Sequence, residues 1–226
     1  MTTDYKSTVF LPQTGFPMKA GLPKLEPEIL ARWQDMDIQA LHRKAAKEKE
    51  KFILHDGPPY ANGHLHIGHA LNKILKDFVV RARTMAGFDA PYVPGWDCHG
   101  LPIELQVDRE LGSKRQQMSV AEVRRECRRY AEKYVDVMRD DFKRLGILGA
   151  WSTPYLTMNY RYQAAIVRAL GALVQQGITY KGKKPVHWCI HCRTALAEAE
   201  VEYEPHTSPS IYVEFPLAAE STAAFG

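Results

Sequence analysis

Two histidines at the start of a helical pattern are the residues of this chain best placed to do chemistry. His66 and His69 lie three positions apart, so on the first turn of a helix they share one face. A helix N-terminus carries unpaired N–H groups and a partial positive charge, which suits phosphate, and two imidazoles there can donate hydrogen bonds to a triphosphate. Gly68 lacks a side chain, so a base or ribose can approach the backbone closely. Taken alone, these four letters (HIGH) fit two surface histidines on an ordinary helix equally well.

The residues around the histidines predict a strand, a loop and a helix. Phe52–Leu54 is an apolar run that predicts a buried strand, and the Gly- and Pro-rich segment 56–63 predicts a loop. Units of this kind lie at the carboxyl edge of a parallel sheet, where nucleotides bind. The helix is predicted from apolar residues spaced by three or four, with Gly87 as its end: Ile67, Leu71, Ile74, Phe78, Ala82 and Met85.

A carboxylate is predicted to share the edge of the sheet with the histidines. Ala90–Val93 predicts a second strand, which Pro94 and Gly95 end, so that Asp97 follows its carboxyl end. A carboxylate in that crevice can bind the ammonium group of an amino acid. A helix cap or a structural ion pair is the alternative for an isolated Asp97.

The pair Cys189 and Cys192 forms a CxxC, which is half of a tetrahedral zinc site. His187 and His191 are further candidate ligands, but neighbours in one short loop rarely complete a tetrahedron, and no second CxxC follows. A reduced, metal-free knuckle is the alternative. Zn²⁺ is therefore a possible but doubtful cofactor.

Composition indicates a globular protein with a core. The 226 residues are 45% hydrophobic and 25% charged, and the net charge of +4 is compatible with an RNA partner without arguing for one. Four cysteines do not form a secreted disulfide scaffold, so we expect a reducing, cytoplasmic location. No apolar run approaches the roughly 18 residues of a membrane span, so no membrane partner is expected.

Periodicity and breaker residues predict the remaining segments. They are an extended arm over 1–24, a helix from Pro27 to about Lys49, a polar linker over 105–118, a helix from the capping box Ser119–Glu122 to Gly146, a helix over Tyr160–Gln176 with Ala164, Val167, Leu170, Leu173 and Val174 inward, and a strand over Ile211–Phe215.

Longer motifs resemble a known family. Gly57–His69 (GPPYANGHLHIGH), followed by NKILKD, resembles the signature of class I aminoacyl-tRNA synthetases, whose ATP-binding motif is named HIGH. Pro94–Glu104 (PGWDCHGLPIE) places the resemblance with the branch that handles isoleucine. The resemblance runs from about Thr8 to Phe215.

The resemblance implies an α/β fold: the first half of a Rossmann-like nucleotide-binding fold with a parallel sheet, preceded by a helical N-terminal arm and ending at the start of an inserted editing domain. It divides the chain into an arm and helix (1–50), the first half of the catalytic domain (51–180), a CxxC knuckle and connector (181–206) and the truncated start of the editing domain (207–226).

The resemblance also implies a reaction. ATP, with Mg²⁺, and L-isoleucine react to give isoleucyl-adenylate and pyrophosphate, and the isoleucyl group then moves to tRNA(Ile). His66 and His69 are implied as the catalytic residues, and together with Gly57 and Gly68 they bind ATP. Asp97 is implied to bind the amino group and Pro58 to contact the isoleucine side chain.

Two aromatic residues, Tyr60 and Trp96, are expected as walls of the amino-acid pocket, although Tyr60 can equally serve packing.

One departure limits the implied function. The family's second signature, the lysine-rich KMSKS loop, is absent from these residues. We therefore expect an N-terminal portion of a synthetase with little or no adenylation activity alone, which requires the remainder of the enzyme. The alternative is a non-catalytic nucleotide- or RNA-binding fragment with a zinc knuckle.

Overall fold

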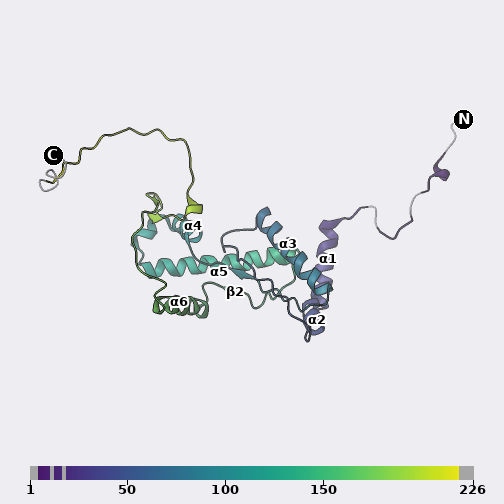
Figure 1. The fold of residues 1–226 in the computed structure, drawn as a ribbon. Helices are drawn as coiled ribbons and strands as arrows, with labels where there is room; N and C mark the ends of the chain where they lie inside the picture. Colours follow the sequence, from purple (N-terminus) through teal and green to yellow (C-terminus); the bar gives the residue numbers. More distant parts are fainter. Residues whose placement is uncertain (1–4, 11–12, 17–18, 219–226) are drawn as a thin grey trace. The chain divides into compact units, whose positions relative to one another are not determined.

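The computed structural model describes residues 5–10, 13–16 and 19–218, and the chain divides into two compact units, Met1–Thr179 and Tyr180–Gly226. Figure 1 follows their elements along the chain. The first unit contains a short 3₁₀ helix (Lys6–Thr8), α1 (Leu22–Asp35), α2 (Ile38–Ala45), α3 (Ile67–Met85), β1 (Gly95–Trp96), α4 (Leu101–Leu111), a second 3₁₀ helix (Gly112–Gln117), α5 (Val120–Arg144), β2 (Tyr155–Leu156) and α6 (Tyr160–Gln175). The second unit contains β3 (Trp188–Cys189), β4 (Thr194–Ala195) and a 3₁₀ turn (Glu198–Glu200).

Three extended segments of the first unit run parallel, which confirms the predicted direction of the sheet. β1 pairs with β2 in parallel, with Gly95 opposite Tyr155. Isolated parallel bridges join Lys51 to Asp89 and Tyr60 to Asp97. The segment 89–97 therefore lies between the segment 51–60 and β2.

The predicted strands Phe52–Leu54 and Ala90–Val93 are wrong. These segments form isolated bridges and not a continuous strand pair, because proline interrupts their pairing. The Phe52 N–H donates to the Asp89 carbonyl at 2.9 Å, and the Asp89 N–H donates to the Glu50 carbonyl at 2.8 Å. The next donor of a parallel ladder, two residues beyond Asp89, is Pro91, which has no N–H.

Gly95 does not end the second strand as predicted, since it is the first residue of β1. It is needed there because a Cβ at this position would overlap the ring of Tyr155 on β2.

The single helix predicted from Pro27 to Lys49 is two helices. α1 begins at Leu22 because Pro23 occupies its first turn, where a missing N–H costs nothing. The chain then breaks after Asp35, and Asp37, with a φ of 44°, starts α2 by accepting a hydrogen bond from the Ala40 N–H at 3.2 Å.

The polar linker predicted over 105–118 is also wrong, because most of it is α4 and a 3₁₀ helix. Ile103 and Val107 are buried one turn apart on α4, so this helix has an apolar stripe although many of its residues are polar. The capping box of α5 is confirmed: the Ser119 hydroxyl accepts from the Glu122 N–H at 3.3 Å, and the Glu122 carboxylate accepts from the Ser119 N–H at 2.7 Å.

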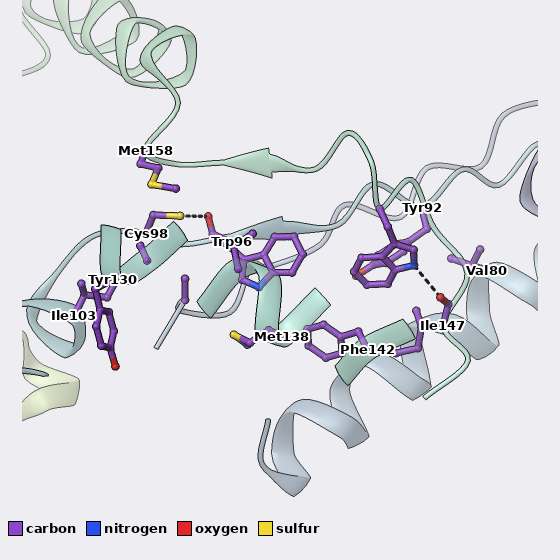
Figure 2. Close-up of a cluster of buried hydrophobic side chains, with 14 of the residues drawn as sticks. Val80, Tyr92, Trp96, Cys98, Ile103, Tyr130, Met138, Phe142, Ile147 and Met158 are labelled. Carbon is purple, nitrogen blue, oxygen red and sulfur yellow. Dashed lines mark hydrogen bonds between the residues drawn. The ribbon is translucent and has the colours of Figure 1, made fainter. Parts of the chain in front are cut away.

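The core lies between α5 and the strand pair. Figure 2 shows Trp96 of β1 directed toward Met138 and Phe142 of α5. Each of these three side chains is at most 1% exposed, and the Phe142 ring stacks on Trp151 at 6.0 Å between centroids. The Trp151 indole N–H donates to the Ile147 carbonyl at 2.9 Å, the dashed line at the right of Figure 2.

Two helices present apolar surface to solvent. α6 has no buried residue, so the predicted inward direction of its apolar side chains is wrong in this unit. On α3 the buried residues are Lys73 and Val80, whereas the predicted apolar stripe is largely exposed. Its most exposed members are Ile67, Leu71, Phe78 and Met85.

The second unit is built around a hairpin in which β3 and β4 pair antiparallel, with Trp188 opposite Ala195. The predicted strand Ile211–Phe215 is wrong: these residues have no regular structure and are exposed, because no described segment pairs with them.

Candidate functional site

The segments 51–60 and 89–97 meet where the chain turns toward α3. The Ala61 N–H donates to the Asp97 carbonyl at 2.9 Å, and the Asp97 N–H donates to the Pro59 carbonyl at 2.8 Å. Asp97 thus follows β1 directly and lies beside Tyr60, at the edge where the loop to the histidines begins. The structure therefore brings Asp97 and the predicted loop to one edge of the sheet.

His66 and His69 form the N-terminal cap of α3. His66 is the N-cap, and its Nδ1 accepts hydrogen bonds from the Gly68 N–H at 3.1 Å and the His69 N–H at 3.3 Å. The His66 N–H donates to Nδ1 of His69 at 3.4 Å. The two rings stack with centroids 3.7 Å apart. This capping box, built from two histidines, was not predicted from the sequence.

The cap fixes where the ring protons of His66 and His69 reside. Both Nδ1 atoms act as acceptors for backbone N–H groups, so in the neutral rings the proton lies on Nε2. Each ring then has one N–H left to donate. Burial, with the nearby charges of His66 and Lys73, lowers the pKa of His69, which favours this neutral form.

Gly68 leaves room for the His66 ring of the cap as well as for a ligand that approaches the backbone. A Cβ at Gly68 would lie 3.0 Å from the Cε1 and Nδ1 atoms of His66, tighter than ordinary van der Waals contact. A side chain here would therefore disturb the His66 ring even before a ligand is considered.

Two neighbours orient the Asp97 carboxylate. The Thr157 hydroxyl lies 3.3 Å from Oδ1 of Asp97, and the His99 N–H donates to the same oxygen at 3.3 Å. Thr157 also accepts from the Cys98 N–H at 2.8 Å, so it connects the segment after β2 to the end of β1. Sequence reasoning missed Thr157, because nothing in its surroundings (YLTMNY) marks a ligand-binding residue.

The other predicted binding residues lie on the loop or in the core. Gly57 is exposed, with open space where a Cβ would be, and Pro58 is half-buried. Tyr60 is 46% exposed, so part of its ring is accessible from solvent, and its role as a pocket wall stays a prediction. Trp96 is 0% exposed and part of the core, so its side chain presents no surface to a ligand in this structure.

A buried ionic cluster beside the loop was also missed. Asp56 precedes Gly57, and its carboxylate accepts hydrogen bonds from Lys73, from Lys76 at 2.5 Å and from the Tyr92 hydroxyl at 2.8 Å. Burial alone would raise the pKa of Asp56, but the two lysines hold it below its ordinary value. Burial lowers the pKa of Lys73.

The CxxC pair lies on the hairpin of the second unit. Sγ of Cys189 accepts a hydrogen bond from the Cys192 N–H at 3.2 Å, and this contact lowers the pKa of the Cys189 thiol. Within residues 5–10, 13–16 and 19–218, no group of three or more His, Cys, Asp and Glu side chains is arranged to hold a metal ion. Zinc binding by Cys189 and Cys192 stays a prediction.

Over the same described residues, no helix combines the length and the apolar composition needed to cross a bilayer.

Comparisons with known proteins identify the family of this chain. The chain is 63% identical over 214 residues to the isoleucine–tRNA ligase of Geobacter sulfurreducens, which covers 95% of this chain and 23% of that protein. It is 58% identical over 220 residues to the isoleucine–tRNA ligase of Syntrophotalea carbinolica, with coverage of 97% and 24%. The chain thus spans about a quarter of the length of these curated relatives.

A solved structure shares the fold. It is the agnB2 LeuRS of Agrobacterium radiobacter K84 in a ternary complex with tRNA and LeuAMS, matched with a TM-score of 0.61 and 23% identity over 80% of this chain and 21% of that chain. A family model described as tRNA synthetases class I (I, L, M and V) matches residues 28–216, which is most of the sequence. The chain therefore belongs to the class I tRNA synthetases of the isoleucine, leucine, methionine and valine group.

Proposed function

We propose that this chain provides part of the adenylate-forming site of an isoleucine–tRNA ligase, which activates L-isoleucine with ATP and transfers it to tRNA(Ile). Identity of 56–63% to isoleucine–tRNA ligases over nearly the whole chain supports the choice of amino acid. The chain spans only about a quarter of the length of those proteins.

The proposal rests on the hydrogen bonds of the histidine cap. His66 and His69 each have Nδ1 engaged by the backbone and an Nε2–H left to donate, at the positive end of a 19-residue helix. Two ring N–H donors at a helix N-terminus suit the phosphates of a nucleotide. Asp97, at the same edge of the sheet, suits the ammonium of an amino acid.

Adenylate formation depends on the positioning of the reacting groups more than on proton transfer. In adenylate formation, the amino acid carboxylate attacks the α-phosphorus, the bond to the bridging oxygen of pyrophosphate breaks, and no proton need move. His66 and His69 would donate hydrogen bonds to the phosphate oxygens that gain charge, while Asp97 holds the ammonium group. ATP would enter with Mg²⁺, to which we assign no ligand among the described residues.

We propose that further chain of the synthetase completes the site. The segment 51–60 is bridged only to 89–97 among the described residues, and the apolar stripe of α3 beside it is exposed. An exposed apolar face of this kind is typical of a surface that another element covers.

The decisive experiment measures isoleucine-dependent ATP–pyrophosphate exchange in two proteins. The first is this 226-residue chain; the second is a chimera in which the chain replaces the segment of the Geobacter sulfurreducens ligase that it matches. We expect strong exchange with isoleucine, but not with leucine, from the chimera and little from the chain alone. A chimera that folds but supports no isoleucine-dependent exchange would contradict the proposed function.

A binding role without catalysis would give a different result. Calorimetry of the chain with ATP and with the sulfamoyl analogue of isoleucyl-adenylate separates the two cases. Tight, isoleucine-selective analogue binding favours the adenylate site, whereas weak binding of any nucleotide favours a non-catalytic module.

A further inference from the structure

Asp56 is the most heavily bonded carboxylate in the described part of the chain. Its side chain is 0% exposed and accepts from both Lys73 and Lys76. Tyr92 donates its hydroxyl to the same carboxylate at 2.8 Å and accepts from Lys73 at 3.1 Å. The Asp56 carbonyl accepts the Tyr155 hydroxyl at 2.6 Å.

The energetics argue that Asp56 and Lys73 do more than stabilise the fold. Lys73 is only 3% exposed, and its Nζ lies 5.5 Å from the centre of the Phe142 ring, a cation–π contact that offsets only part of the cost of burying the charge. Removing two charges from water costs several kcal/mol per ion, and apolar replacements of buried pairs are often neutral or stabilising. We therefore infer that the buried Asp56–Lys73 ion pair serves mainly to hold neighbouring segments in place, and only secondarily to stabilise the fold.

That geometry connects the parts of the proposed site. Asp56 is the residue before Gly57 and Pro58 of the loop. Lys73 lies four residues after His69, so it faces the same side of α3 one turn farther along. Tyr155 is on β2, which pairs with β1, and Asp97 follows β1 directly. Asp56 therefore ties the loop to the histidine helix through its carboxylate and to the sheet through its main-chain carbonyl.

We propose that the Asp56–Lys73 ion pair is a positioning pair, which sets the distance between the Gly57–Pro58 loop and the imidazoles of His66 and His69. This inference rests on the proposed function. It predicts that breaking the pair slows adenylate formation beyond any loss of folded protein, because a misplacement of about 1 Å in such a site can cost 100-fold in rate.

A second ion pair provides a matched control. Arg43 holds Asp89 through two hydrogen bonds, and the Asp89 side chain is 3% exposed. Asp89 lies on the same pair of extended segments as Asp56, but at the Lys51 end, away from the loop. Asp89→Asn therefore removes a comparable buried carboxylate without touching the loop or α3.

The test compares Asp56→Asn, the double variant Asp56→Asn/Lys73→Met and Asp89→Asn in the chimera described above. Exchange kinetics give kcat and the KM values for ATP and isoleucine, and urea unfolding gives stability. We expect kcat to fall about 10- to 100-fold in Asp56→Asn. Asp89→Asn should lower the urea midpoint and leave kcat within about threefold of the parent.

The double variant separates positioning from stability. Replacing both partners removes the orphaned charge, so the urea midpoint should recover relative to Asp56→Asn while kcat stays low. Recovery of kcat together with the midpoint, or equal losses of kcat in Asp56→Asn and Asp89→Asn, would overturn the proposal.

Tyr155→Phe keeps the test decisive if Asp56→Asn does not fold. It removes only the hydroxyl that donates to the Asp56 carbonyl, and we expect a small fall in the urea midpoint together with a severalfold fall in kcat; an unchanged kcat would count against the proposal. An inactive parent chimera would contradict the proposed function, whereas an active parent with insensitive variants contradicts only the positioning role.

Discussion

His66 uses the two nitrogens of its ring for different purposes. Nδ1 accepts from the Gly68 and His69 N–H groups and so replaces the Ser, Thr, Asp or Asn that usually caps a helix. Nε2 remains free of these bonds and has a proton to donate. A histidine at this position therefore stabilises α3 and also leaves a ring N–H at its N-terminus that can donate to an anion.

The two uses of His66 are separable by substitution. His66→Asn keeps an acceptor at the cap but loses the Nε2–H, whereas His66→Ala loses both. We expect His66→Ala to lower the free energy of unfolding by about 1 kcal/mol and His66→Asn by less. Both should weaken binding of the adenylate analogue similarly, as measured by calorimetry. Analogue affinity that follows stability across the two variants would show that only the cap matters.

We expect His69 to make the stability of the first unit depend on pH. Burial, then the charges of His66 and Lys73, depress the pKa of folded His69 below its ordinary value of 6.5. Between these two values the unfolded chain binds more protons at this ring than the folded chain does, so acidification through that window removes stability. The Nδ1 atoms that accept the cap bonds also become donors when the rings are protonated.

We therefore expect the urea midpoint to fall from pH 7 to pH 5 and to fall less in His69→Gln. His206→Gln, in the second unit, is the matched control and should keep the pH dependence of the parent. An identical pH profile in the parent and in His69→Gln would contradict this assignment.

At the scale of the elements, α3 has three surfaces with different tasks. Its N-terminus holds the histidine cap, one side carries Lys73 into the core, and another side exposes an apolar stripe. A lone surface helix normally buries its apolar stripe. On α3 a lysine is buried instead, which the ion pair with Asp56 makes possible.

The exposed stripe predicts a difference between the chain and the chimera. Leu71 and Phe78 are 61% and 62% exposed, so changing both to Gln should alter the free energy of unfolding of the 226-residue chain by no more than about 0.5 kcal/mol per site. In the chimera the same change should sharply reduce soluble, active enzyme, because there we expect the stripe to be covered. Met36→Gln, 53% exposed at the α1–α2 break, should affect neither protein.

Local signals were sufficient for some elements and insufficient for others. The capping box Ser119–Glu122 and the 3.6-residue period predicted α5 because both signals lie within the helix itself. α4 was missed because its apolar face is short and most of the segment 105–118 is polar. The strand over 90–93 was predicted from its apolar composition, but Pro91 prevents its pairing. The loop was predicted from its Gly and Pro residues, and Asp97 from its place after a predicted strand. Thr157 and the Asp56 cluster depend instead on contacts between distant segments that no local pattern encodes.

The whole molecule is divided unequally between its two units. The first contains every buried residue found among the described ones, including the Trp96, Phe142 and Trp151 cluster. The second has a hairpin of two-residue strands and an exposed segment. A two-stranded hairpin is at best marginally stable alone, so the cooperative folding of the chain belongs to the first unit.

Truncation after Thr179 tests this division. The shortened chain should keep the thermal midpoint and near-ultraviolet circular dichroism of the full chain, since none of the described residues 180–218 is buried. Truncation after Arg144 is the control: it removes β2, Trp151 and the Tyr155 hydroxyl that holds Asp56, and should abolish the cooperative transition. A clear drop in midpoint on removal of Tyr180–Gly226 would mean that the second unit stabilises the first, and hence that the hairpin with Cys189 and Cys192 is part of the folding unit that carries the histidine cap.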